Sequence, residues 1–230
     1  MADTPTVFVV DDDADIRQSL EMLIRSAGWS VETYSMAEEF LDQYDAERPG
    51  CLVLDLQMPG MGGMELLDRL ARWTLAVPVI VVTGHGDVST AVKALHQGAV
   101  DFLEKPFART ELLQRVGTSI QQDGRRRARR RWSDELRRRR DELSKGERDV
   151  LRMIVDGKSN KEMAAALGLS RRGIDARRAN VMRKMEATSV PALVRMVVSL
   201  DSEPTLGVWA GAGLAPGYAA PGADAGASAT

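Results

Sequence analysis

Two kinds of hydrophobic pattern alternate over the first 120 residues. Short runs rich in valine, leucine and isoleucine are typical of buried strands, and the stretches between them repeat apolar residues every three to four positions, as helices do. The runs predict strands at 6–10, 29–34, 51–54, 77–82 and 99–103, and the periodic stretches predict helices at 15–27, 35–44, 63–73, 87–96 and 109–120. Ser35 and Glu38 have the spacing of a capping box for the second helix. Five βα units with strands apolar on both faces indicate an α/β doubly wound, five-stranded parallel sheet.

The pattern changes after residue 142. Ser144 and Ser159 each precede a glutamate by three positions, which is the spacing of a capping box. Gly168 then predicts a tight turn, and Ser170 caps the helix that follows. Residues 143–200 are therefore predicted to form an all-α domain of four short helices, with the caps and the tight turn that are typical of a helix-turn-helix.

A basic segment, 122–142, connects the two regions and contains good helix formers. We expect a helical linker, exposed to solvent on most sides. Trp132, Leu136 and Leu143 have heptad spacing, so a short dimer seam is the alternative. The last 30 residues, 201–230, are rich in alanine, glycine and proline and are predicted to be a disordered tail.

The distribution of charge supports two domains with different functions. The 230 residues carry a formal net charge of −2, yet residues 1–123 hold 20 acidic and 9 basic side chains, whereas residues 124–200 hold 22 basic and 10 acidic ones. A basic segment of this density is typical of nucleic-acid binding, and the acidic segment needs another role. The expected division is 1–121, the linker, 143–200 and the tail.

Composition also excludes several classes of protein. No stretch approaches the about 18 apolar residues of a membrane span, and the N-terminus lacks the features of a secretion signal, so we expect a cytoplasmic protein without membrane contacts. The single cysteine, Cys51, cannot form an internal disulfide and is expected in the core. His85 and His96 are too few for a Cys/His zinc site and are interpreted as surface or hydrogen-bonded groups.

Four predicted strands end in groups suited to phosphate chemistry, at the edge where open parallel sheets bind ligands. Asp11 to Asp13 follow the first strand, Asp55 the third, Thr83 the fourth and Lys105 the fifth. Crowded carboxylates repel one another unless a hard cation such as Mg²⁺ shares them. If Mg²⁺, Thr83 and Lys105 cover the oxygens of a phosphoryl group, Asp55 can attack the phosphorus in line.

Residues 5–121 resemble the receiver domain of bacterial two-component response regulators, whose fold is flavodoxin-like. The matching motifs are Val9-Val10-Asp11-Asp12-Asp13, Leu54-Asp55-Leu56-Gln57-Met58-Pro59-Gly60, Val82-Thr83-Gly84-His85-Gly86 and Asp101-Phe102-Leu103-Glu104-Lys105-Pro106-Phe107. The resemblance implies that Asp55 is phosphorylated. It also implies that Asp11, Asp12, Asp55 and the carbonyl of Gln57 hold Mg²⁺.

Three further roles follow from the same resemblance. Lys105 would pair with the phosphoryl group, Thr83 would turn toward it, and Phe102 would be the aromatic side chain whose rotamer reports the change. Taken singly, each feature has an ordinary explanation, since residues 11–13 could start a helix, Thr83 could form a turn and Phe102 could be a core residue. Their order at four strand ends favours a phosphoryl acceptor.

Residues 143–199 resemble the LuxR/FixJ-type DNA-binding domain, and the whole chain resembles a FixJ-family transcriptional regulator. The motifs are Leu143-Ser144-Lys145-Gly146-Glu147-Arg148-Asp149-Val150-Leu151, Gly157-Lys158-Ser159-Asn160-Lys161-Glu162-Met163-Ala164 and Arg178-Ala179-Asn180-Val181-Met182-Arg183-Lys184-Met185. The helix from Arg171 would enter the major groove, and the last helix, 190–200, would pair in dimers. The candidate DNA contacts are Asn160, Lys161, Arg171, Arg172, Asp175, Ala176, Arg177, Arg178, Ala179, Arg183 and Lys184.

Two residues of the predicted recognition helix depart from the family pattern. Gly173 weakens the helix by about 1 kcal/mol relative to alanine. Asp175 stands among the base-facing candidates, with Ala176 and Ala179, where it could accept a hydrogen bond from cytosine N4 or simply repel phosphates. The operator of the family therefore cannot be carried over to this chain.

The resulting hypothesis is a response regulator. A sensor histidine kinase phosphorylates Asp55 with Mg²⁺ present, the protein forms a homodimer, and the dimer binds double-stranded DNA to regulate transcription, with RNA polymerase as a candidate partner. A separate enzymatic output is not expected, because a phosphatase would need a second acid where Gln57 stands. The remaining alternative is an orphan regulator that binds DNA without phosphorylation and uses the first domain as a dimer module.

Overall fold

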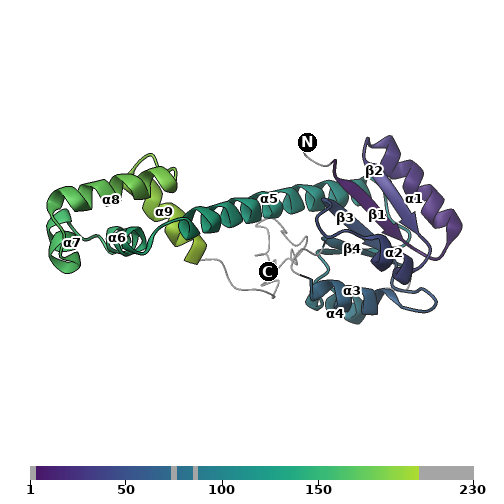
Figure 1. The fold of residues 1–230 in the computed structure, drawn as a ribbon. Coiled ribbons are helices and arrows are strands. Elements are labelled where there is room, and N and C mark those ends of the chain that lie inside the picture. Colours follow the sequence, from purple (N-terminus) through teal and green to yellow (C-terminus); the bar gives the residue numbers. More distant parts are fainter. Residues whose placement is uncertain (1–3, 74–76, 85–87, 202–230) are drawn as a thin grey trace, which may run out of the picture.

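The computed structural model describes residues 4–73, 77–84 and 88–201, which form two lobes joined by a long helix (Figure 1). The first lobe contains β1 (Thr6–Val10), α1 (Ala14–Ser26), β2 (Ser30–Tyr34), α2 (Ala37–Gln43), β3 (Gly50–Leu54), α3 (Gly63–Ala71), β4 (Val79–Thr83), α4 (Val88–His96), β5 (Asp101–Glu104) and the first part of α5 (Arg109–Asp141). The second lobe contains α6 (Lys145–Val155), α7 (Asn160–Leu167), α8 (Arg171–Lys184) and α9 (Val190–Asp201). His85 and the expected disordered tail from residue 202 onward lie outside the described residues.

The sheet of the first lobe is parallel throughout, in the order β2-β1-β3-β4-β5. β1, β3 and β4 are buried along their whole length because helices cover both faces, which explains why these segments read as continuous apolar runs. The register places Val10 beside Leu54 and Thr83 beside Glu104. The expected doubly wound sheet is confirmed, and the ends of β1 and β3 lie level with each other.

The two faces of the sheet have separate hydrophobic cores. α2, α3 and α4 contribute to the core around Phe8 and Leu66, and α1 and α5 contribute to the core around Ile24 and Leu112. Cys51 lies fully buried in the second of these cores, where burial raises the pKa of its thiol, and its expected place in the core is confirmed. His96 is exposed at the end of α4.

The predicted capping box of α2 is wrong. α2 begins at Ala37 with Met36 as the N-cap, so that Ser35 lies one position outside the helix and its backbone N–H and hydroxyl both donate to Glu39 Oε2, at 3.1 and 3.3 Å. Glu38 does not cap the helix, because its Oε1 accepts a hydrogen bond from the backbone N–H of Met61 at 3.0 Å. The glutamate chosen from sequence spacing therefore holds the loop between β3 and α3.

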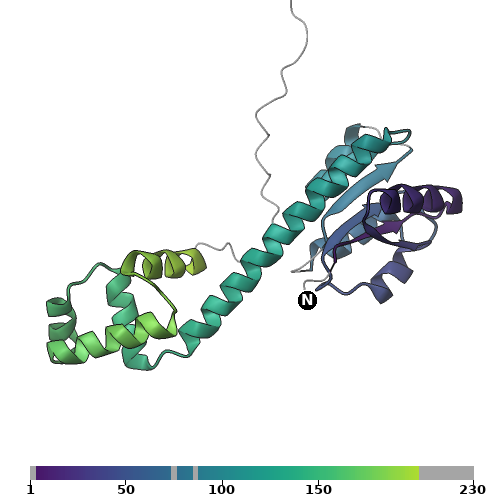
Figure 2. The same cartoon turned by 90° about the horizontal axis from the view of Figure 1, so that it is seen from above.

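The connection between the lobes is one continuous helix, whereas the sequence pattern predicted a helix at 109–120 and a separate linker helix. α5 runs for 33 residues and projects from the first lobe toward the second (Figure 2). Gly117 and Gly124 flank the predicted break, and the cost of about 1 kcal/mol for each glycine is too small to interrupt a helix anchored at both ends.

The middle of α5 is more buried than expected for a solvated basic helix. Arg127 is 5% exposed and Asp123 2% exposed, because the two side chains pair with each other against the first lobe. Ser133 and Leu136 are also buried, and Leu136 and Leu143 belong to the core of the second lobe. Two of the three residues of the alternative dimer seam are therefore used within the chain, and only Trp132 remains exposed.

The second lobe has the four expected helices. Both predicted capping boxes are present, at Ser144 with Glu147 and at Ser159 with Glu162, and Ser170 caps α8. Gly168 adopts a left-handed φ of 63° at the end of α7, which an L side chain tolerates poorly, and so makes the turn into α8. The core consists of Leu136, Leu143, Val150, Leu151, Ile154, Met163, Ile174, Val181, Met185, Leu193, Val197 and Leu200.

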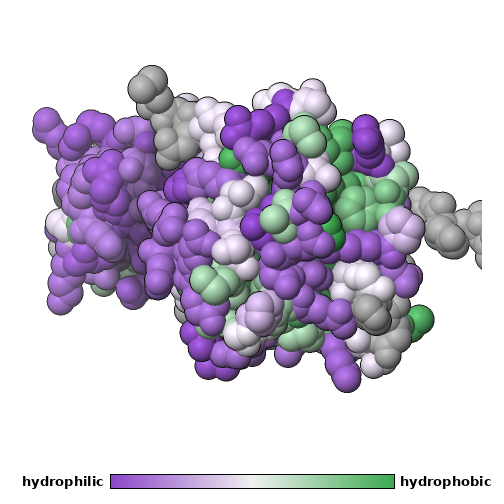
Figure 3. Space-filling model, turned by 90° about the vertical axis from the view of Figure 1, so that its right-hand side faces the viewer, coloured by the Kyte–Doolittle hydropathy of each residue, from purple (hydrophilic) through white to green (hydrophobic). Residues whose placement is uncertain are grey.

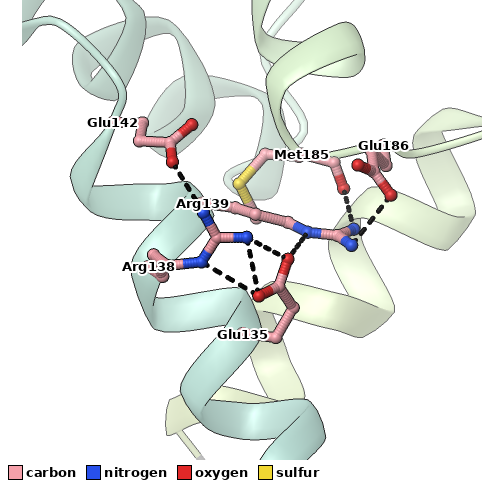
Figure 4. A network of polar contacts seen from close by, with 6 residues as sticks. All are labelled: Glu135, Arg138, Arg139, Glu142, Met185 and Glu186. Carbon is pink, nitrogen blue, oxygen red and sulfur yellow. Dashed lines mark hydrogen bonds and ion pairs between the residues drawn. The ribbon is translucent and has the colours of Figure 1, made fainter.

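Charged groups attach the far end of α5 to the second lobe (Figure 4), in addition to Leu136 and Leu143, which belong to its core. Arg139 donates to the backbone carbonyl of Met185 at 3.4 Å and pairs with Glu186 at 2.8 Å and with Glu135 at 2.7 Å. The same guanidinium lies 5.8 Å from the centre of the Trp132 ring. α5 therefore ends as a part of the second lobe, and one continuous helix connects the two lobes.

Glu147 is the most protected carboxylate of the second lobe, and its charge is expected to stabilise the domain. Its side chain is 8% exposed and bonds Lys184 Nζ at 2.7 Å and the backbone N–H of Ser144 at 2.8 Å. The Lys184 contact, followed by the Ser144 contacts, lowers the pKa of Glu147 from 4.5 to about 2. Since the folded pKa is the lower one, the stabilisation is complete above pH 4.5 and is lost as the pH falls toward 2.

Glu147→Gln is therefore expected to lower the stability of the second lobe at pH 7 by about 1–2 kcal/mol, while preserving the capping hydrogen bonds that glutamine can still make. It should also remove the loss of stability between pH 4.5 and about pH 2 that Glu147 causes. Urea titrations at several pH values, with hydrogen exchange in α6 as the readout, measure both effects. Glu162→Gln is the matched control, because it changes the same position of an exposed capping box. An acid sensitivity of Glu147→Gln equal to that of the wild type would contradict this assignment.

Candidate functional site

Three carboxylates meet where β1 and β3 end. Asp11 follows β1 and Asp55 follows β3, and the level register of these strands brings them together with Asp12. One ligand oxygen from each of the three lies within 4.8 Å of the others, although Asp11 is only 2% exposed and Asp55 8% exposed. The sequence-based prediction that these acids share one edge of the sheet is confirmed in space.

Lys105 is the basic group of this cluster. Its Nζ lies 2.8 Å from Asp11 Oδ2 and 3.5 Å from Asp55 Oδ2, and the backbone N–H of Lys105 donates to the carbonyl of Thr83 at 2.9 Å. Thr83 is buried at the end of β4, and Phe102 is half-buried on β5 and packs against the core. The four predicted strand ends thus converge on one site.

Asp13 has a different role from its two neighbours. Its Oδ1 accepts from the backbone N–H groups of Asp15 and Ile16, at 2.9 and 3.2 Å, so Asp13 is the N-cap of α1. Its own backbone N–H donates to Asp11 Oδ1 at 2.9 Å. The ordinary explanation of the acidic run as a helix start applies to Asp13.

The electrostatics of the site favour a bound cation. Burial raises the pKa of Asp55 above its usual value, the nearby ammonium of Lys105 opposes this shift, and the charge of Asp11 adds to it. Three carboxylates facing one lysine leave uncompensated negative charge, and oxygen ligands of this kind suit Mg²⁺. The residues present therefore fit the expected ion. The backbone N–H of Gln57 lies 3.5 Å from Asp55 Oδ1, which places the β3–α3 loop at the site.

Two contributions to this site were missed by the sequence analysis. A side chain at Gly63 would place its Cβ 2.2 Å from the carbonyl oxygen of Asp55, so only glycine allows α3 to begin this close to Asp55. Arg17 donates to the carbonyl of Asp11 at 2.6 Å and supports the end of β1. The Gly62-Gly63 pair was the available signal for the first, and nothing in the local pattern indicated the second.

The candidate DNA contacts occupy different positions around α7 and α8. Exposed positions suited to DNA contact are Lys161, Arg171, Arg172, Asp175, Ala176, Ala179 and Arg183. Arg177 is half-buried, and its guanidinium lies so close to Gly146 that a Cβ there would come within 2.4 Å of it. Lys184 is engaged by Glu147 and by the carbonyl of Glu142 at 3.1 Å. The side chain of Arg177 therefore lies against α6, and that of Lys184 contacts α6 and the residue that follows α5, so neither occupies an exposed position suited to DNA contact.

Asn160 and Arg178 form a polar group with Asp175. The side-chain amide of Asn160 donates to Asp175 Oδ1 at 2.6 Å, and its carbonyl oxygen accepts from Arg178. Asn160 is the first residue of α7, whereas the other two residues lie on α8. This group links the two helices of the helix-turn-helix at an accessible face.

Comparisons with known proteins agree with this architecture. The sequence profile of the response regulator receiver domain matches residues 7–117, and that of the luxR family of bacterial regulatory proteins matches residues 141–197. The transcriptional regulatory protein FixJ of Rhizobium meliloti is 42% identical over 194 residues, which cover 84% of this chain and 95% of that protein. The chain is a response regulator of the FixJ family. Its family implies a kinase partner and DNA binding.

Other relatives of the regulator show the same coverage. Nodulation protein W of Bradyrhizobium diazoefficiens is 40% identical over 194 residues, covering 84% of the regulator and 86% of that protein. Among solved structures, the response regulator StyR superposes with a TM-score of 0.78 at 39% identity, over 85% of the regulator and 98% of StyR. Full-length FixJ from B. japonicum gives a TM-score of 0.54 at 39% identity, over 88% and 100% of the two chains. Among the described residues, none of the regulator's helices combines the length and apolar character that crossing a membrane requires.

Proposed function

We propose that the regulator is switched by phosphorylation of Asp55 and that the phosphorylated form binds DNA as a homodimer. A phosphohistidine of the partner kinase donates the phosphoryl group. An Asp55 carboxylate oxygen attacks the phosphorus, the P–N bond breaks, and its electron pair returns to the histidine nitrogen as the aspartyl phosphate forms. The observation that carries this proposal is the position of Asp55, which faces Lys105 within a cluster of acids at the end of β3.

The residues around Asp55 have distinct roles in the proposed transfer. Asp11, Asp12, Asp55 and the carbonyl of Gln57 would hold Mg²⁺, which when bound supplies positive charge for the phosphoryl oxygens. Lys105 exchanges its contact with Asp55 for a phosphoryl oxygen, since its 3.5 Å separation from Asp55 is the longer of its two ion pairs. Thr83 turns its hydroxyl toward the new charge, and Phe102 moves into the space that this opens.

The face for dimerisation is proposed to be α4 together with β5. Val88, Val92 and Leu95 recur at helical spacing on α4 and are 82%, 46% and 44% exposed. Viewed from the end of the molecule that carries the first lobe, the surface is mainly hydrophilic, with groups of hydrophobic residues between hydrophilic ones (Figure 3). The stripe formed by Val88, Val92 and Leu95 is small, and a small apolar surface suits an interface that forms only after the charge at Asp55 changes. RNA polymerase stays a candidate partner of the DNA-bound dimer.

Beryllofluoride, which mimics the aspartyl phosphate, tests the proposed switch in the full chain. With Mg²⁺ and beryllofluoride, we expect light scattering to show a change from monomer to dimer and DNA affinity to rise by about tenfold or more, because two recognition helices then bind together. Omitting Mg²⁺ is the control and should abolish both changes. If mass and affinity stay constant, the phosphorylation switch is rejected, and the alternative of an orphan regulator with a constitutive dimer module is favoured.

A further inference from the structure

Asp175 is the one acid within α8, among basic residues, and it makes no ion pair in the part of the chain that the structure describes. Arg171 and Arg172 lie one turn before it and Arg178 one turn after it, at spacings where arginine and aspartate commonly pair. Its contact is instead with a neutral amide, that of Asn160 on α7. An acid that merely reduced the charge of the helix would be expected to pair with one of these arginines.

The amide of Asn160 has only one acceptable orientation. Its NH₂ group donates to Asp175 Oδ1 at 2.6 Å, and its oxygen accepts from the Arg178 guanidinium. A flipped amide would place the oxygen against the carboxylate and the NH₂ group against the guanidinium, and both contacts would be repulsive. Asn160 therefore holds the carboxylate of Asp175 by one oxygen, and among the described residues the second oxygen, Oδ2, has no partner.

We propose that Asn160 positions Asp175 to read a cytosine in the major groove. This inference rests on the proposed function, since it requires that α8 enters the groove. An ionised aspartate has only acceptors, and the N4 amino group of cytosine is the donor that suits it. Guanine and thymine present acceptors at the corresponding edge and repel the carboxylate, and adenine presents an acceptor beside its amino group.

The hydrogen bond from Asn160 fixes the position of the Asp175 carboxylate relative to the base. Without the amide, Asp175 would be released to pair with Arg171 or Arg172 one turn away, and its free oxygen would no longer point to a fixed place. Asn160 is thus a positioning residue, whereas Asp175 is the residue that touches the base. The exposed arginines of α8, Arg171, Arg172 and Arg183, remain available for phosphates, which fix the register of the helix on the duplex without reading sequence.

Selection of binding sites from a random pool of DNA duplexes tests this proposal with the full chain and beryllofluoride. The wild type is expected to enrich an operator with a cytosine at one position of each half-site, favoured by about tenfold over the other bases. Asp175→Asn should change that position to adenine, because asparagine pairs with N6 and N7 of adenine. Asn160→Ala should make the same position degenerate while leaving the remaining positions unchanged. Asp141→Asn, which removes an exposed acid at the end of α5, is the charge-matched control and should select the wild-type operator.

The possible results separate this inference from the proposed function. If Asp175→Asn enriches the same operator as the wild type, Asp175 does not read a base and the proposal is overturned while sequence-specific binding stands. If Asn160→Ala retains the full cytosine preference, Asn160 does not position Asp175. If the wild type enriches no sequence, both this proposal and the proposed DNA-binding function fail. A uniform rise in the affinity of Asp175→Asn for every duplex would instead identify Asp175 as a residue that only repels phosphates.

Discussion

Asp55→Asn is expected to take up no phosphoryl group, to remain monomeric with beryllofluoride and to bind DNA with an affinity that phosphodonors do not change. The amide has no anionic oxygen to attack phosphorus and cannot form the acyl phosphate. Incorporation of labelled phosphate from an acyl phosphate donor, followed by light scattering and DNA titration, measures the loss. We expect the effect to be complete rather than partial, because no other carboxylate of the cluster occupies the end of β3.

The variant is also expected to fold at least as stably as the wild type. Since burial raises the pKa of Asp55 in the folded protein, the ionised form is disfavoured there relative to the unfolded chain, and replacing it by a neutral group of the same shape removes that penalty. Lys105 keeps its 2.8 Å contact with Asp11. A Tm equal to or above that of the wild type at pH 7 would therefore show that lost phosphorylation is not a consequence of misfolding.

Asp13→Asn is the matched control for Asp55→Asn. It removes one negative charge beside Asp11 and Asp12, but Asp13 is the N-cap of α1, and asparagine caps helices as well as aspartate does. We expect normal phosphorylation of this variant. Phosphate uptake by Asp55→Asn at the wild-type rate would show that another residue is the acceptor.

Arg127→Leu is expected to destabilise the protein by about 3–5 kcal/mol, the largest effect on stability that we predict. Arg127 Nε lies 2.6 Å from Asp123 Oδ2, and its NH1 donates to the carbonyls of Ala46 and Glu47, both at 2.9 Å. Asp123 also accepts from the backbone N–H of Gly50 at 3.1 Å. Removing the guanidinium leaves two carbonyls without their donor, and it leaves the fully buried carboxylate of Asp123 with the partly exposed Arg126, at 2.7 Å, as its remaining ion pair.

The loss is expected to be concentrated where α5 leaves the first lobe. Urea unfolding measures the loss in the free energy of unfolding, and hydrogen exchange along α5 shows which part of the helix loses protection. Spin-label distances between the two lobes should broaden, because the pair of Asp123 and Arg127 attaches the helix to the loop before β3 and to the start of that strand. Arg131→Leu is the matched control, since it removes an exposed arginine one turn further along the same helix and should change stability by less than about 0.5 kcal/mol.

A double variant separates the ion pair from the surrounding packing. Asp123→Leu combined with Arg127→Leu should recover part of the loss, because neither charge of the buried pair then remains, and Arg126, whose side chain is 31% exposed, can be hydrated when it loses Asp123. If Arg127→Leu costs less than about 1 kcal/mol, or if the double variant is less stable than both single variants together predict, the buried pair is not what anchors α5.

Local pattern predicted much of the fold because it depends on interactions between near neighbours. β1 matches its predicted bounds, and the capping boxes at Ser144 and Ser159 need only a serine and a glutamate three positions apart. The same rule gave a wrong result at Ser35, where the helix starts one residue later and Glu38 is drawn to the backbone of Met61. A spacing rule cannot detect a competing partner that is distant in sequence.

The sequence by itself determined the order of the elements and the residues at the ends of β1, β3, β4 and β5, and so indicated the proposed phosphoacceptor site. This follows because apolar periodicity sets each element and a parallel sheet brings all carboxyl ends of its strands to one edge. Only the tertiary structure decided which charged residues are used inside the protein. Arg127 donates hydrogen bonds to carbonyls that lie 81 and 80 positions earlier in the chain. Lys184 forms an ion pair with Glu147, and Asp175 accepts a hydrogen bond from Asn160 of another helix. Periodicity describes one segment at a time, whereas burial and pairing depend on the segments that fold against it.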